Sequence, residues 1–83
     1  MKTLLEKIVD TMTQVFTPKD IQVMQNLIAA RDIDAMKELT DLNLKSFTKQ
    51  KSRIATDERI VMEENFANLK EYMDKYHKAN QIN

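Results

Sequence analysis

Residues 57–79 read DERIVMEENFANLKEYMDKYHKA, and this stretch decides the fold. Its apolar side chains recur at steps of four, three, four and three, at Met62, Phe66, Leu69, Met73 and Tyr76. That spacing sets them along one stripe of an α-helix, because residues three and four apart lie on the same helical face. The stripe is the longest uninterrupted apolar face in the chain, so we expect the earlier helices to pack against it.

Three further helices are predicted upstream, at about residues 2–16, 18–30 and 33–47. Pro18 separates the first two, because it disfavours helical geometry at Thr17 and suits the first position of the next helix. Thr17 can cap that helix through its side-chain oxygen, and Asp32 is the candidate cap for the third helix. The last helix is expected at about 57–79, capped by Thr56.

The connection between the third and last helices is polar from Thr48 to Arg53. The third helix could run unbroken to about Ile54, or it could divide into two shorter helices with a break near Asp41 or Asn43. Residues 48–53 are accordingly either an exposed helix end or a loop. Helix and loop therefore both stay open for residues 45–56. Residues 80–83 are expected to fray.

The composition favours one small helical domain. The chain has 83 residues, no Cys, no Gly and one Pro, and this length accommodates one domain over residues 1–83. The lack of Cys excludes thiolate sites and fits a reducing compartment, and the lack of Gly disfavours β-hairpin turns. No apolar run approaches the roughly 20 residues of a membrane span. We expect a cytoplasmic, all-α protein with no membrane contact: a small antiparallel bundle of three or four helices with a long C-terminal helix.

The core of this bundle should draw on the apolar stripe of each helix. The predicted core residues are Leu5, Ile8, Met12, Phe16, Met24, Leu27, Ile28, Leu39, Phe66, Leu69 and Met73.

The sequence offers little for catalysis. Its one histidine, His77, lies near the end of the last helix and off the apolar stripe. A hydroxyl nucleophile needs a nearby base such as His, and a zinc site needs about four nitrogen or sulfur ligands. The neighbouring acids Glu63 and Glu64 point in different directions on a helix. We therefore predict no enzyme activity, no catalytic residue, no metal site and no cofactor.

Charge is balanced overall but unevenly spread. Residues 1–44 carry five basic and seven acidic side chains, and residues 54–83 carry four and six. Between them lie four basic residues with no acid among them: Lys45, Lys49, Lys51 and Arg53. A helix would align three of these at steps of four, and such a ridge could follow phosphates or face an acidic protein. A solvated segment without a partner is the simplest alternative.

Surplus apolar surface favours a protein interface. Six methionines are present, and Met is an adaptable filler both of cores and of surfaces that accept helices. Ile60 and Ala67 form a second apolar patch on the last helix. The predicted interface residues are Ile60, Ala67, Tyr72 and Tyr76.

The leading hypothesis is a small non-enzymatic regulator, inhibitor or adaptor of the phage or mobile-element type. It would bind another protein through helical faces and would itself form a homo-oligomer. One alternative is a charge-driven nucleic-acid-binding protein that uses residues 45–53. A second alternative is a structural subunit that assembles only with itself. Binding to phosphates should weaken steeply with salt, whereas an apolar protein interface should survive moderate salt.

Overall fold

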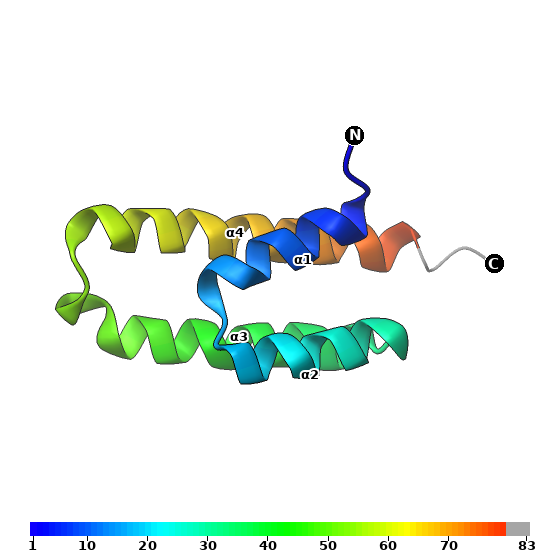
Figure 1. Ribbon diagram of the computed structural model, residues 1–83, viewed down its shortest axis with the longest axis horizontal. Helices are drawn as coiled ribbons and strands as arrows, with labels where there is room; N and C mark the ends of the chain where they lie inside the picture. The colour runs from blue at the N-terminus through cyan, green and yellow to red at the C-terminus, as the bar shows by residue number, and fades with distance from the viewer. Residues whose placement is uncertain (80–83) are drawn as a thin grey trace.

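Four α-helices make up the computed structural model, which describes residues 1–79. They are α1 (Leu4–Val15), α2 (Pro18–Ala29), α3 (Ile33–Gln50) and α4 (Thr56–Ala79), with a short 3₁₀ turn, η1 (Lys51–Arg53), between α3 and α4. Successive helices run in opposite directions, with α1 beside α4 and α2 beside α3 (Figure 1). The predicted all-α antiparallel bundle with a long C-terminal helix is confirmed.

Side-chain caps set where the first three helices begin. The Thr17 side chain accepts a hydrogen bond from the Asp20 amide, and Asp32 accepts one from the Ala35 amide, so both predicted caps are confirmed. Thr3 caps α1 in a reciprocal arrangement: its hydroxyl accepts from the Glu6 amide, and the Glu6 carboxylate accepts from the Thr3 amide. The first helix therefore begins at Leu4 rather than near residue 2, because Thr3 is the extended cap residue.

The turn between α2 and α3 uses a left-handed residue that is not glycine. Arg31 has φ 56°, and its amide donates to the Ile28 carbonyl while the Asp32 amide donates to the Leu27 carbonyl. These two bonds satisfy carbonyls that the end of α2 would otherwise leave unpaired. A side chain at this φ is strained relative to glycine, so the turn forms at a local cost.

The third helix is longer than predicted. It continues through Asp41 and Asn43 without a break and ends at Gln50, three residues beyond the expected 47. Asn43 does not restart the helix, because its amide donates back to the Leu39 carbonyl one turn earlier. The chain then tightens into η1 and becomes extended at Ile54. The last helix begins at Thr56, so the residue in the cap position is Ala55 rather than Thr56.

The core lies between the α1–α4 pair and the α2–α3 pair. Its buried apolar residues are Ile8, Met12, Phe16, Met24, Met36, Phe47, Phe66, Leu69 and Met73. Leu27, Ile28 and Leu39, predicted for the core, are half-buried and pack against it. Leu5, also predicted, is half-buried at the rim of a surface hollow on α1.

Two core contacts explain why α3 is held against α4. The Phe47 and Phe66 rings lie 5.5 Å apart, centroid to centroid, at 35°. Thr40 is the one buried polar side chain of the described residues, and its hydroxyl lies 2.9 Å from the Met36 carbonyl and 3.5 Å from the Met73 sulfur. Phe47 was not predicted to be buried because it extends the apolar face of α3 irregularly, and Thr40 was not because its side chain is polar.

Candidate protein-binding surface

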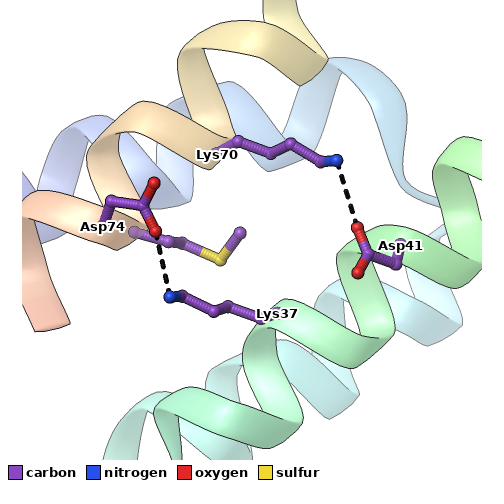
Figure 2. Close-up of a pocket in the computed structure, with 5 residues that line it drawn as sticks. Lys37, Asp41, Lys70 and Asp74 are labelled. Atoms are coloured by element: carbon purple, nitrogen blue, oxygen red, sulfur yellow. Dashed lines mark ion pairs between the residues drawn. The ribbon is translucent and has the colours of Figure 1, made fainter.

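Two ion pairs join α3 to α4 on one side of the molecule (Figure 2). Lys37 Nζ lies 2.9 Å from Asp74 Oδ1, and Lys70 Nζ lies 3.3 Å from Asp41 Oδ1. They rim a hollow of about 230 Å³ with Met73 at its wall. The hydrogen bond from Lys37, together with its charge, lowers the pKa of Asp74 below its ordinary value.

The four charges match the register in which α3 and α4 pack. Lys37 and Asp41 are one turn apart on α3, and Lys70 and Asp74 are one turn apart on α4. A slip by one helical turn would place Lys37 opposite Lys70, or Asp41 opposite Asp74. Because exposed pairs contribute little stability, their main effect is to disfavour these slipped arrangements.

The register shows which residues of α3 and α4 lie at the same level near η1. On α3, Lys37 and Asp41 continue at steps of four to Lys45 and Lys49. On α4, Asp74 and Lys70 continue at steps of three and four to Ala67, Glu63 and Ile60. The ion pairs set the level of one helix against the other, so Lys45 and Lys49 lie about level with Glu63, although each step of four turns the α3 row by about 40° away from α4. We call the exposed residues at this level, Lys45 and Lys49 on α3 and Ile60, Glu63 and Ala67 on α4, the α3–α4 face.

The predicted basic residues divide between two elements. Lys45 and Lys49 lie on α3, whereas Lys51 and Arg53 lie in η1, so the regular ridge of three basic residues does not form. A continuous ridge would need α3 to reach Arg53, and it ends at Gln50. All four side chains are exposed and lie outside every ion pair of residues 1–79.

The four predicted interface residues do not share one surface. Ile60 and Ala67 are exposed on the α3–α4 face, and Ile60 retains 49% of its surface. Tyr72 and Tyr76 are half-buried and pack against the protein's own core. Lys7 Nζ lies 5.9 Å from the centre of the Tyr72 ring, which ties that side chain to α1. The structure therefore leaves Ile60 and Ala67, but not the tyrosines, on the open face.

A second hollow lies where the start of α4 meets the end of α1. It measures about 380 Å³, with Val61 and Met62 among the residues that line it and Asp57 and Glu58 contributing acidic side chains. Val61 is 53% exposed. This hollow adds apolar surface near the turn, but it opens on the α1 side of α4 and is separate from the α3–α4 face.

The acidic side chains and the one histidine of the described residues are not gathered into a metal site. Within residues 1–79, no three His, Cys, Asp or Glu side chains are placed to hold a metal ion together. His77 is half-buried near the end of α4. In the same part of the chain, none of the helices has both the length and the apolar character needed to cross a bilayer.

Comparison of the chain with models of known families, with curated proteins and with solved structures finds no match. The function must therefore be argued from the surface itself. The ion pairing between α3 and α4 was not predicted from the sequence, although a signal was present: a Lys followed four residues later by an Asp occurs once in each of these two helices. Two antiparallel helices with that spacing can pair reciprocally.

Proposed function

We propose that this protein is a small non-enzymatic regulator or adaptor that binds another protein through its α3–α4 face. The observation that carries the proposal is the exposure of Ile60 and Ala67 beside charges that the fold leaves unpaired. An apolar centre with a charged surround is the usual anatomy of a protein interface.

The unpaired charges of both signs at this end of α3 and α4 favour a protein partner over a nucleic acid. Lys45 and Lys49 lie outside the ion pairs of the described chain, and so do Glu63 and Glu64. A phosphate backbone attracted to the two lysines would also approach the two carboxylates, which repel it. A protein surface can present charges of both signs in a matching arrangement.

A matched pair of variants tests this proposal. Ile60→Ser removes apolar surface from the α3–α4 face, and Val23→Ser removes an exposed apolar side chain, 38% against 49%, from α2. Both variants should unfold at about the wild-type temperature because neither side chain is buried. In affinity capture from host lysate treated with nuclease, a stoichiometric protein should be retained by wild type and by Val23→Ser and lost from Ile60→Ser. Equal retention by all three proteins would contradict the proposal.

Nucleic-acid binding is the second candidate, because Lys45, Lys49, Lys51 and Arg53 are all exposed and unpaired within the described chain. If they contact phosphates, the logarithm of affinity should fall linearly with the logarithm of salt concentration. Changing the four residues to Gln should then remove most of that slope. A binding curve that is unaffected by salt would exclude this candidate.

A further inference from the structure

An apolar hollow with an acidic rim lies between the end of α1 and the start of α4. It measures about 380 Å³ and is lined by Gln14, Asp57, Glu58, Val61, Met62 and Asn65. We call it the α1–α4 hollow. Val61 retains 53% of its surface and Met62 is half-buried, so the hollow presents apolar side chains to solvent. Both of its charged residues are acidic, and none of the six is basic.

The two acids of the hollow have no ion-pair partner among residues 1–79, and both are exposed. The cation next to them in sequence, Arg59, is two residues from Val61, a step that turns an α-helix by about 200° and places it on the opposite side of α4. The helix dipole favours acids in a first turn, as with Asp34 at the start of α3. It gives no reason for an exposed Val61 one turn beyond Asp57, on the same face of α4. Apolar surface and unpaired negative charge therefore occur together in this hollow.

An occupant that complements this surface brings an apolar side chain and positive charge together. We propose that the α1–α4 hollow binds a basic segment of another protein. An apolar side chain of that segment packs against Val61 and Met62, and Lys or Arg residues beside it pair with Asp57 and Glu58. This surface is separate from the α3–α4 face, so the inference goes beyond the proposed function and gives the protein a second binding surface.

The acidic rim disfavours other occupants of the α1–α4 hollow. A nucleic acid would bring its phosphates against two carboxylates, which repel it. A twofold contact between two copies of the hollow would set one acidic rim against the other, which is also repulsive. A basic segment of a foreign protein meets neither obstacle.

Selection from a random-peptide library displayed on phage tests the chemistry of the occupant before any partner is known. Peptides retained by the wild-type protein should carry Lys or Arg next to an apolar residue. Their binding should weaken with salt, because exposed charges are screened beyond about 3 Å in 1 M salt but only beyond about 30 Å in 0.01 M. Enrichment of acidic or uncharged peptides alone, or no enrichment, would overturn the inference.

Matched variants locate the binding of a selected peptide. Asp57→Asn with Glu58→Gln removes the acidic rim and should raise the dissociation constant at least about tenfold, and Val61→Ser should raise it as well. Asp34→Asn with Glu38→Gln removes the same two charges from exposed positions on α3, one of them in its first turn, and should leave the dissociation constant unchanged. Circular dichroism at the binding temperature checks that every variant is folded. Equal weakening by the two charge variants would show attraction to net charge alone and would overturn the inference.

Two further readouts separate this surface from the α3–α4 face and from self-association. If every selected peptide is lost from Ile60→Ser and kept by Val61→Ser, the inference fails and the proposed function stands. If peptides are lost from Val61→Ser and kept by Ile60→Ser, the inference stands whether or not the α3–α4 face binds a protein. Sedimentation of the wild type checks for a second copy. Self-association that Asp57→Asn with Glu58→Gln abolishes would place a second copy in the hollow and overturn the foreign partner.

Discussion

Phe66→Ala is the substitution that should damage this fold most. Phe66 lies in the middle of α4, retains 2% of its surface, and stacks on Phe47 at 5.5 Å. Truncating a buried Phe removes transfer energy and leaves a cavity, and together these cost about 3–5 kcal/mol. The lost ring pair accounts for about 0.5–1.5 kcal/mol within that range.

This loss is large against the stability of the whole chain. At about 0.05–0.15 kcal/mol per residue, a protein of 83 residues is stable by roughly 4–12 kcal/mol. Each kcal/mol lowers the melting temperature of a domain this size by about 4–8 °C, so Phe66→Ala should lower it by at least about 12 °C. If the wild type is stable by only about 4 kcal/mol, the variant should be largely unfolded at room temperature.

The assay is thermal and urea unfolding followed by far-ultraviolet circular dichroism. Val61→Ala is the matched control, because Val61 lies on the same helix but is 53% exposed, and it should melt within a few degrees of wild type. If Phe66→Ala melts no lower than Val61→Ala, α4 is not the helix around which the core is organised.

Three other changes probe the helix ends and the α3–α4 register. Arg31→Gly should raise the free energy of unfolding by about 0.5–1 kcal/mol in urea titration, since glycine adopts φ 56° without strain; a decrease would show that the Arg31 side chain stabilises the turn. Thr17→Ala should lower it by about 0.5–2 kcal/mol through loss of the cap on α2, whereas Thr17→Ser should not. Because the pKa of Asp74 is lowered by Lys37, the stability from this pair is present above the ordinary value of 3.8 and is lost as pH falls through the lower folded value. The free energy of unfolding should therefore change less between about pH 6 and about pH 2 in Lys37→Gln than in wild type. An identical pH dependence in the two proteins would contradict the pairing.

The sequence predicts helices well where a local signal marks an end. Thr17-Pro18 and Asp32 act within one turn of themselves, so their caps are predictable from neighbours alone. The Thr3–Glu6 capping box is an equally local signal, but it was not used to place the start of α1. No local signal marks the end of α3 at Gln50. Residues 48–53 have no apolar period, so whether they continue the helix depends on how α4 packs.

The sequence predicts the surface less well, because register is a tertiary property. Tyr72 and Tyr76 extend the apolar stripe of α4, and only the placement of the other helices shows that both pack inward. Which residues of α3 lie level with Ile60 and Ala67 becomes known only once the ion pair between Lys37 and Asp74 shows the register. Spacing within a helix is visible in the sequence, whereas the level of one helix against another is not.

The most direct test of the α3–α4 face is site-specific photocrosslinking in the host cell. A photoreactive amino acid is placed at exposed Glu64 in one protein and at exposed Val23 on α2 in another, and the products are resolved by mass. The account predicts discrete crosslinked products from position 64 and none from position 23. Products from position 23 alone, or equal products from both positions, would contradict it.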